Sequence, residues 1–534
     1  MAFALTKLAV VSTLHRGRNK SDKLRDGIDG MWSTFEVEIG DPGMLIRFLG
    51  PYLHLRTSGQ TVRLLPGTSA YTGNVVSVVT PQGCSQDPAI ANCTASRGNV
   101  FFRNQSSSWS THGLPNGGTS ALERASQDSL ILAENSSYGF DTLRFPCPDV
   151  PLVANLMVAE YSTSEFWLGT LGLSPLASNF SVSNVSAPSL LSVLRQRGGI
   201  DSLSWAYTAG AYYRSVFGSL TLGGYDESRF DRNRSITVPF AADPSRDLVV
   251  GIQSITHDIP GGDALGGGYY AFIDSMISQM WLPESVCDRF EQAFNLTWNS
   301  TSELYLVDEE LHKDLVRRNS TITFNLGGAD ALANGQTVGI ELPYEAFDLN
   351  ISAPLVDQKS RYFPLKRANS TTQYTLGRMF LQAAYVVADY DKSEFLVAQA
   401  LYPRIYDRKS LVAILHPKGT QPSKATITGV TVGAIVAVGM CGGFAALAMS
   451  RRRQRQQINT TAAENDEKRD LDDLGSSSSS TKSIAELSGT ETQIYEAQDN
   501  RGDLPELPEK KRASVRYEMF SGIAVAELDS SCRS

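Results

Sequence analysis

A single aspartate inside an apolar stretch is the first residue of this chain whose type and setting could do chemistry. Asp274 lies in FIDSMISQMWLP, residues 272–283, where two apolar residues precede it and Ser275 follows it. A carboxylate in such a setting tends to keep its proton, and acid–base catalysis by carboxylates depends on a second carboxylate that shares that proton. Asp274 is therefore either half of a catalytic pair or the remnant of one.

Other reactive patterns are absent from the sequence. The six histidines form no i, i+4 pair and no Cys-x-x-Cys occurs, so we expect no zinc or redox site. The glycine-rich stretch GGDALGGG, residues 261–268, lacks the Lys-Ser/Thr of a phosphate-binding loop, and the G-x-S-x-G of a nucleophile elbow is missing. We therefore predict neither a metal nor a cofactor.

The elements that would position Asp274 are predicted to be strands. Short alternating or apolar runs such as STFEVEI (33–39), DLVVGIQSI (247–255) and AYVVADY (384–390) are separated by Gly, Pro, Asn and Asp clusters. PSLLSVLRQRG (188–198) and PESVCDRFEQAF (283–294) are the two convincing helical stretches. The pattern predicts an all-β protein with occasional helices, and its repetition predicts two related lobes.

The composition excludes one class of partner. The 534 residues, 42% of them apolar and 19% charged, are enough for a large core. The net charge of -8, without a basic stripe outside one short cluster of arginines, argues against a nucleic-acid partner.

A transmembrane helix is predicted near the C-terminus. Residues 427–449 carry no charge and are followed at once by RRRQR, and at about 1.5 Å per residue they span the roughly 30 Å of a bilayer core. The arginines place the C-terminal side in the cytoplasm, which makes the chain a type I protein of the plasma membrane or a secretory-pathway membrane. A buried helix of a soluble domain is the alternative. Residues 450–534, with GSSSSSTKS and few aromatics, are predicted to be a disordered tail whose partners the sequence does not specify.

Glycosylation acceptors agree with an exported N-terminal part, because Asn-x-Ser/Thr is modified only in the secretory lumen. Before the span they begin at Asn92, Asn104, Asn135, Asn179, Asn184, Asn233, Asn295, Asn299, Asn319, Asn350 and Asn369. A poorer candidate stands at Asn19, and only Asn459 lies beyond the span. Some of these matches are expected to arise by chance.

The cysteines and the N-terminus fit export unequally. Cys84 and Cys93 enclose a short polar loop and are the expected disulfide, while Cys147 with Cys287 is a pairing that the spacing does not support. Residues 1–29 begin with MAFALTKLAVVSTL, whose apolar run is interrupted by Lys7 and lacks a clean cleavage site. They are either a poor signal peptide or a sign that the true start of the protein lies elsewhere.

Four motifs in one order carry a family resemblance. WLGTLGLSP (167–175) is followed by GSLTLGGYDESRF (218–230), by FIDSMISQMWLP and by LGRMFLQAAYVVADYD (376–391). In this order they resemble the pepsin-like aspartic peptidases, and most closely the fungal branch with a C-terminal transmembrane helix and a long tail. The resemblance covers residues 31–405. It implies a bilobal pepsin-like all-β fold with a cleft between a first lobe at 30–228 and a second at 229–405, before a stalk at 406–426.

The resemblance implies two catalytic aspartates, of which only one is found. Asp274 matches the second-lobe aspartate, although Met276 and Ile277 replace the glycine and the hydroxyl residue that follow it in the family. In the first lobe, QTVRLLPGTS (60–69) matches the strand and loop, and Pro66 is predicted to stand where the aspartate is missing.

Two further aspartates could be proposed as replacements for the missing one. Asp263 lies in a predicted hairpin tip, and Asp389 matches a structural position of the closing motif. Neither is therefore a strong candidate for the second catalytic carboxylate.

Residues 43–59 are a predicted insertion. They separate Ile39-Gly40-Asp41-Pro42 from Gln60 with GMLIRFLGPYLHLRTSG, where the family runs almost directly on. We interpret them as a retained intron or another gene-model error.

The sequence thus predicts a glycosylated, single-pass cell-surface protein. Its pepsin-like ectodomain is expected to be inactive and to bind a peptide or cell-wall ligand in the cleft, as a binding or sensing module. The alternative is an active membrane-anchored aspartic endopeptidase that uses an unusual dyad.

Overall fold

The structure is a computed structural model. It describes residues 9–11, 25–41, 46–49, 52–55, 59–69, 75–85, 90, 92–121, 135–146, 150–163, 167–180, 185–328, 335–403 and 408–415. The chain divides into two units, residues 1–416 with 515–534 and residues 417–514, and the described residues all belong to the first. The span predicted at 427–449 and the tail at 450–534 lie outside the described residues. Among the residues that the structure describes, no helix is long and apolar enough to cross a membrane.

A seven-stranded sheet organises the first half of the described chain, in the order β11-β8-β12-β7-β4-β10-β9. Its strands are β4 (Phe35–Ile39), β7 (Gln60–Gly67), β8 (Val76–Val79), β9 (Thr119–Ala121), β10 (Asn135–Arg144), β11 (Val153–Tyr161) and β12 (Thr170–Gly172). In β4 the buried Phe35, Val37 and Ile39 alternate with the half-buried Glu36 and Glu38. This period of two is that of a strand with one face on a core.

A second seven-stranded sheet organises the second half, in the order β25-β24-β19-β20-β29-β21-β28. Its strands are β19 (Val249–His257), β20 (Tyr269–Ile273), β21 (Met280–Leu282), β24 (Thr321–Gly327), β25 (Thr337–Pro343), β28 (Leu365–Arg367) and β29 (Thr375–Leu376). A four-stranded sheet comprises β22 (Trp298–Asn299), β23 (Leu304–Val307), β26 (Leu349–Ile351) and β27 (Ser360–Phe363). Two amphipathic helices, α4 (Glu284–Phe294) and α5 (Glu309–Arg318), complete this half.

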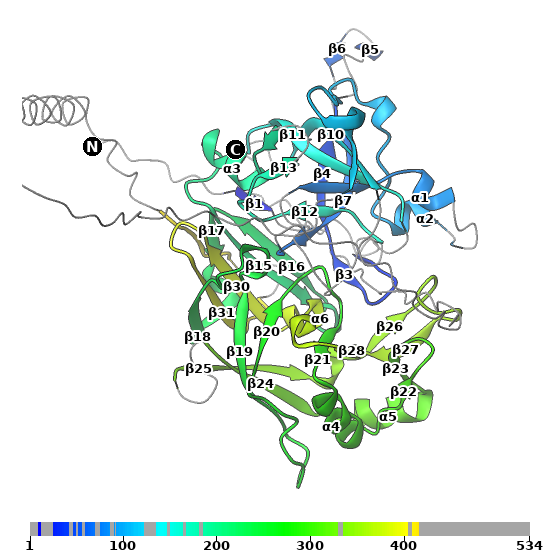
Figure 1. Cartoon of the computed structure of the whole chain (residues 1–534), viewed down its shortest axis with the longest axis vertical. Coiled ribbons are helices and arrows are strands. Elements are labelled where there is room, and N and C mark those ends of the chain that lie inside the picture. The colour runs from blue at the N-terminus through cyan, green and yellow to red at the C-terminus, as the bar shows by residue number, and fades with distance from the viewer. Residues whose placement is uncertain are drawn as a thin grey trace, which may run out of the picture. The chain divides into compact units, whose positions relative to one another are not determined.

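A six-stranded sheet contains strands from both halves, in the order β1-β16-β15-β30-β31-β18. Its strands are β1 (Ala9–Val11), β15 (Ser204–Ala211), β16 (Val216–Leu222), β18 (Phe230–Pro239), β30 (Ala384–Asp389) and β31 (Glu394–Ala400). Figure 1 places it between the two seven-stranded sheets, with the short α6 (Arg378–Leu381) beside it. The edge strand β1 comes from the segment predicted as a poor signal peptide, and it pairs with β16 through Ala9 and Leu222.

Shorter elements cover the sheets. They are β2 (Arg25–Asp26), β3 (Trp32–Ser33), β13 (Ser178–Phe180), β14 (Val185–Ala187), β17 (Gly224–Asp226), β32 (Leu411–Ala413), α1 (Gln82–Ser85), α2 (Cys93–Ser96) and α3 (Leu190–Gln196). The largest fully buried side chains include Trp167, Trp205 and Trp281, which lie in different parts of the chain. The described chain is mostly β, as the sequence pattern predicted.

The predicted insertion contains a hairpin of its own. β5 (Ile46–Leu49) and β6 (Tyr52–Leu55) pair with each other, and they form a separate two-stranded sheet. It projects from the β4 and β7 end of the first half (Figure 1). A lone two-stranded hairpin is marginally stable in water, so this segment adds little to the fold.

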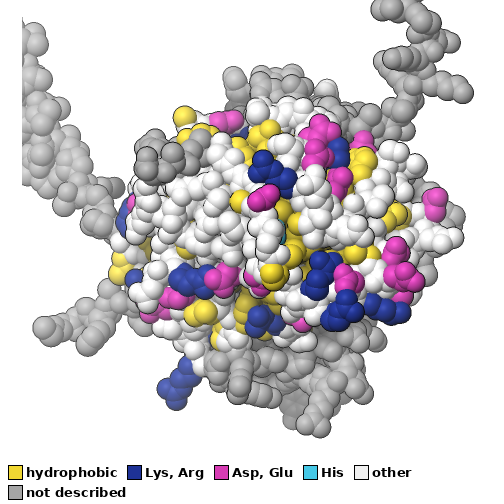
Figure 2. All heavy atoms as spheres, turned by 90° about the horizontal axis from the view of Figure 1, so that it is seen from below, with side chains coloured by type: hydrophobic (Ala, Val, Ile, Leu, Met, Phe, Trp, Pro, Cys, Tyr) yellow, Lys and Arg dark blue, Asp and Glu magenta, His cyan; other side chains and the backbone are white. Residues whose placement is uncertain are grey.

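The lower face of the molecule carries charges of both signs. Figure 2 shows Lys and Arg side chains interleaved with Asp and Glu there. On α5, Lys313 pairs with Glu309 and Arg318 with Asp314, and Arg361 of β27 also reaches Glu309. Exposed pairs of this kind contribute little to stability, and the face has no continuous basic stripe.

Candidate active site

Two loops from the two halves of the chain meet through a reciprocal set of hydrogen bonds. The Thr68 amide donates to Ser275 Oγ at 3.0 Å, and the Ser275 amide donates to Thr68 Oγ1 at 2.9 Å. The hydroxyls lie 3.1 Å apart, and Ser275 Oγ donates to the Pro66 carbonyl at 2.6 Å. Thr68 and Ser275 are 2% and 0% exposed, so these bonds form away from water and fix one loop against the other.

The strand register in the first half identifies each residue of its loop. β7 runs parallel to β12, with Pro66 opposite Leu171 and Gly67 opposite Gly172. The Leu173 amide donates to the Gly67 carbonyl at 3.0 Å, which holds the end of β7 in this register.

The second half repeats the arrangement. β20 runs parallel to β29, with Ile273 opposite Leu376, and the Asp274 amide donates to the Leu376 carbonyl at 3.1 Å. The next position in the register sets Asp274 beside Gly377. Because both partner strands read Thr-Leu-Gly, the two halves can be compared residue by residue.

This comparison corrects the position of the missing aspartate. Pro66 is equivalent to Ile273, Gly67 to Asp274, and Thr68 to Ser275. The sequence had placed the lost carboxylate at Pro66, one residue too early, because PGTS was matched to the family's Asp-Thr-Gly-Ser letter by letter. Gly67 occupies the position that is equivalent to Asp274, and it supplies no side chain.

Asp274 itself is held as a buried carboxyl group, 5% exposed. Its Oδ1 accepts a hydrogen bond from the Met276 amide at 2.8 Å. Burial raises the pKa of Asp274 to about 6, and the Met276 amide and the charges of Arg378 and Arg246 oppose part of that rise. Asp274 is therefore protonated in acid and ionised above neutrality.

Arg378 braces the loop that carries Asp274. It is completely buried, and its Nη1 donates to the Ser275 carbonyl at 2.5 Å. Its Nη2 lies 3.7 Å from Oδ2 of Asp29, which is also buried, and its guanidinium lies 5.2 Å from the ring centroid of Trp32. Burial lowers the pKa of Arg378, and Asp29 and Asp274 both favour its charged form.

The sequence reading missed Arg378 and Asp29 as site residues. An arginine inside the apolar run LGRMFLQAA was the available signal, because a buried cation needs partners. Asp29 is distant along the chain, and nothing in the sequence connects the two.

The bulky residues after Asp274 pack into the core. Met276 and Ile277 are buried, and the Gly377 backbone approaches this loop closely. A Cβ on Gly377 would lie 2.1 Å from the Gln279 carbonyl oxygen and 2.4 Å from that of Ile277. Glycine at this position is therefore required by the loop, although the loop itself lacks the family's glycine.

The two alternative carboxylates lie elsewhere. Asp263 is exposed in the loop that joins β19 to β20, in agreement with its reading as a hairpin tip. Asp389 ends β30 and forms an ion pair with Lys392 at 3.6 Å. The structure brings neither of them to the Thr68–Ser275 contact.

The hairpin of β9 and β10 is only partly described. Asn135 pairs with Ala121, and residues 122–134 between the two strands lie outside the described residues. Tyr138 is a buried residue within β10.

The cysteines and the glycosylation acceptors are placed as follows. Cys84 and Cys93 form a disulfide, and Cys287 is a buried free thiol on α4, while Cys147 lies outside the described residues. Exposed acceptor asparagines are Asn92, Asn104, Asn179, Asn233, Asn295, Asn299, Asn350 and Asn369, and Asn319 is half-buried. The side chains of Asn135 and Asn184 lie outside the described set. Within the described residues no group of three or more His, Cys, Asp or Glu could hold a metal.

The comparison with known families is decisive for one stretch of the chain. Residues 157–400 match the model of the eukaryotic aspartyl protease family. This stretch is therefore similar to the eukaryotic aspartyl protease family. The matched stretch includes Asp274 and Gly377, whereas Gly67 lies before its first residue.

Two curated fungal proteins are also similar to this chain. "Secreted aspartic protease 8" of Candida albicans is 23% identical over 250 residues, which cover 47% of this chain and 53% of that protein. "Candidapepsin" of Candida tropicalis is 24% identical over 263 residues, which cover 48% of this chain and 58% of that protein. The chain thus spans about half the length of the curated relatives that it matches.

Proposed function

We propose that the pepsin-like region binds an extended peptide or cell-wall ligand and does not hydrolyse it. The observation that carries this proposal is that Gly67 stands at the position of the first half that is equivalent to Asp274. Peptide hydrolysis by two aspartates needs one carboxylate to activate water while the other protonates the substrate. A glycine at the first position supplies neither function.

The lone carboxyl group can still take part in binding. Below its pKa of about 6, Asp274 donates a hydrogen bond, and above it the ionised group accepts hydrogen bonds. The Thr68–Ser275 contact and the Arg378 brace hold the loop that carries it. A fixed polar group that is not consumed by catalysis suits a binding or sensing module.

We further propose that this region is exposed at the cell surface on a single transmembrane helix at 427–449. The uncharged span, its arginine flank and the acceptor asparagines before it support this topology. The exposed positions of most described acceptors suit glycosylation. In this arrangement the lipid bilayer holds the chain, and the tail at 450–534 faces the cytoplasm.

An active membrane-anchored aspartic endopeptidase is the second candidate. It is favoured by the names of both relatives, which describe proteases, and by the contact between Thr68 and Ser275. Under this alternative Asp274 would need a carboxylate from another part of the chain.

A cleavage assay separates the two candidates. The full chain is incubated with a peptide library at pH 3 to 6, with and without a transition-state-type inhibitor of aspartic peptidases, beside Asp274→Asn and the exposed control Asp263→Asn. We expect no inhibitor-sensitive cleavage from any of the three. Turnover that the inhibitor blocks and Asp274→Asn abolishes, with Asp263→Asn unaffected, would establish the endopeptidase.

A binding assay tests the proposed role directly. Library peptides retained by the full chain are identified, and their affinities are measured again in the presence of the same inhibitor. Competition between retained peptides and inhibitor is expected, because both would occupy the site of Asp274. Failure to retain any peptide or wall polysaccharide would overturn the binding function.

A further inference from the structure

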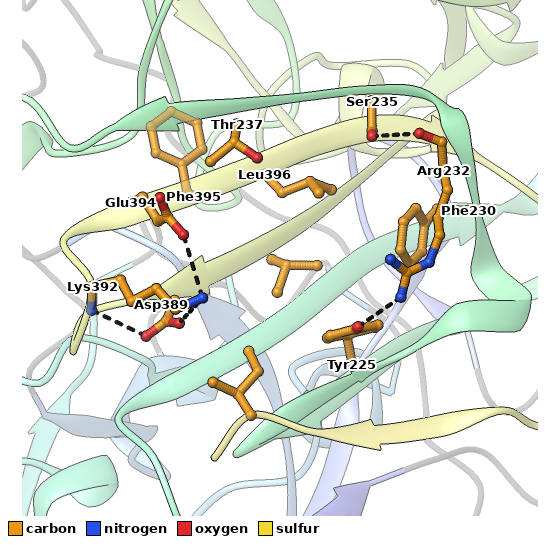
Figure 3. A pocket seen from close by; sticks show the side chains of 12 residues that line it. Tyr225, Phe230, Arg232, Ser235, Thr237, Asp389, Lys392, Glu394, Phe395 and Leu396 are labelled. Atoms are coloured by element: carbon orange, nitrogen blue, oxygen red, sulfur yellow. Dashed lines mark hydrogen bonds and ion pairs between the residues drawn. The ribbon is translucent and has the colours of Figure 1, made fainter. Parts of the chain in front are cut away.

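A pocket of about 270 Å³ opens on the six-stranded sheet. Its lining includes none of the residues of the loops around Thr68 and Ser275, so it is a separate feature. Its lining residues come mainly from β18, β30 and β31, and they include the apolar Val387 and Leu396 and also Ile414, which follows β32. Figure 3 shows the pocket from close by, with Leu396 among the labelled side chains.

One end of the pocket has an ordered aromatic wall. Tyr225 packs edge-on against the buried Phe230 at 5.8 Å between ring centroids. Phe230 in turn stacks on Tyr385 at 5.3 Å with an interplanar angle of 6°. Arg232 donates from Nη2 to the Tyr225 hydroxyl at 2.9 Å and from Nε to Glu227 at 2.8 Å. The half-exposed Tyr225 ring is therefore held in place from two sides.

The other end is lined by charges. Asp389, with a side chain 7% exposed, lies 3.6 Å from Lys392 Nζ, and Glu394 lies 3.5 Å from the same ammonium group (Figure 3). Ser235 and Thr237 of β18 also line the pocket. Hydrogen-bond donors and acceptors thus stand at both ends of the apolar lining.

The distribution of polar and apolar groups in the pocket favours a ligand that has both polar and apolar surfaces. A purely apolar ligand would bury the charged groups without replacing their bonds to water, which is costly. A pyranose of glucose type has two apolar C–H faces and a ring of equatorial hydroxyls. Its faces match Tyr225 and the apolar lining, and its hydroxyls can reach carboxylate, ammonium and guanidinium groups at the rim.

We propose that this pocket binds a glucose-type pyranose, as a glucosyl or N-acetylglucosaminyl unit of a saccharide. Two sources can present that chemistry. The first source is an external saccharide, such as a wall glucan or chitin chain. The other is the N-glycan predicted on this chain at Asn233, an exposed residue next to Arg232.

Titration of the full chain with laminaritriose and chitotriose, followed by saturation-transfer NMR, tests the proposal. A galactose-type trisaccharide, whose axial hydroxyl interrupts one apolar face, serves as the mismatched ligand. We expect binding of the two glucose-type trisaccharides, with at least tenfold weaker binding of the galactose-type one. Tyr225→Ala and Glu394→Gln should each weaken binding at least tenfold, and the exposed Asp263→Asn should leave it unchanged.

The variant Asn233→Gln distinguishes the two sources. If the chain's own glycan occupies the pocket, added trisaccharide binds to Asn233→Gln and not to the glycosylated protein. If the ligand is external, both forms bind it alike. Absence of binding in both forms would overturn the proposal, as would unchanged binding by Tyr225→Ala and Glu394→Gln variants that keep the wild-type Tm.

Discussion

Gly67 and Asp274 occupy equivalent positions in two loops that Thr68 and Ser275 hold together. The strand registers of β7 with β12 and of β20 with β29 establish this equivalence. The two loops are therefore held together although only one of the two equivalent positions carries a carboxyl group. A single substitution can test that conclusion.

Gly67→Asp is expected to place a second carboxylate beside Asp274. Two carboxyl groups in one buried site share a proton, so their apparent pKa values should separate, one below and one above the value of about 6 found for Asp274 alone. An NMR titration of the aspartate carboxyl carbons measures this directly.

Pro66→Asp is the matched control, because its side chain starts one residue earlier and on the opposite face of β7. It should leave the Asp274 titration near its original value. If Pro66→Asp produced the split titration and Gly67→Asp did not, the residue equivalence would be wrong. Acid-dependent cleavage of peptides by Gly67→Asp alone would extend the result to catalysis.

Asp274 should make stability depend on pH. Its pKa is about 6 in the folded protein, whereas the ordinary pKa of an aspartate is 3.8, so the folded state holds the proton more tightly than the unfolded state. Its contribution is fully present below pH 3.8 and is lost as the pH rises through 6. A shift of about two units corresponds to roughly 3 kcal/mol.

Urea unfolding of the full chain between pH 3.5 and 7.5, beside Asp274→Asn, measures this dependence. The free energy of unfolding of the wild type, relative to the variant, should fall by about 2–3 kcal/mol across that range. The Asp274→Asn variant contains all the other titrating groups, so subtracting its free energy of unfolding removes their contribution. A difference between the two proteins that stays constant with pH would show that Asp274 does not titrate there.

The sequence predicted the fold class and the second-lobe loop because both depend on local patterns. The setting of Asp274, the strand at residues 384–390 and the helix containing Cys287 are read from neighbouring residues. The equivalence of Gly67 is different, since it depends on which residues pair across strands. A one-residue error there changes the face on which a side chain lies, and single-sequence patterns do not fix it.

Arg378 was missed for a related reason. Its partners Asp29 and Ser275 are brought to it only by the folded chain, and no sequence spacing indicates the contact. The pocket lined by Tyr225 and Asp389 likewise combines residues from strands far apart in sequence. Features that depend on such long-range contacts follow from the structure alone.

Arg378→Met should be strongly destabilising. It removes the hydrogen bond to the Ser275 carbonyl and the cation next to buried Asp29, and breaking a buried ion pair costs about 3–5 kcal/mol. Chemical unfolding measures the loss. Arg317→Met on α5, whose arginine side chain is 77% exposed, is the control and should change the free energy of unfolding by less than about 1 kcal/mol.

A second readout separates the electrostatic role of Arg378 from its packing role. Because its charge opposes the burial effect on Asp274, Arg378→Met should raise the Asp274 pKa above about 6, whereas Arg378→Lys should do so less. Equal pKa values in all three proteins would limit Arg378 to packing.

Deletion of residues 43–59 should leave the fold intact. Ile39 of β4 and Gln60 of β7 are paired across the sheet, so the chain ends left by the deletion lie close together and residues 40–42 can close a short turn. The lost β5–β6 hairpin forms its own sheet. We expect the variant to keep the wild-type Tm within about 2 °C or to exceed it, because a shorter loop costs less entropy to close.

Sequencing of the mature transcript is the companion measurement, and we expect the transcript to lack the codons for residues 43–59. A transcript that encodes these residues, together with a deletion variant that fails to fold, would make the hairpin a genuine part of the protein.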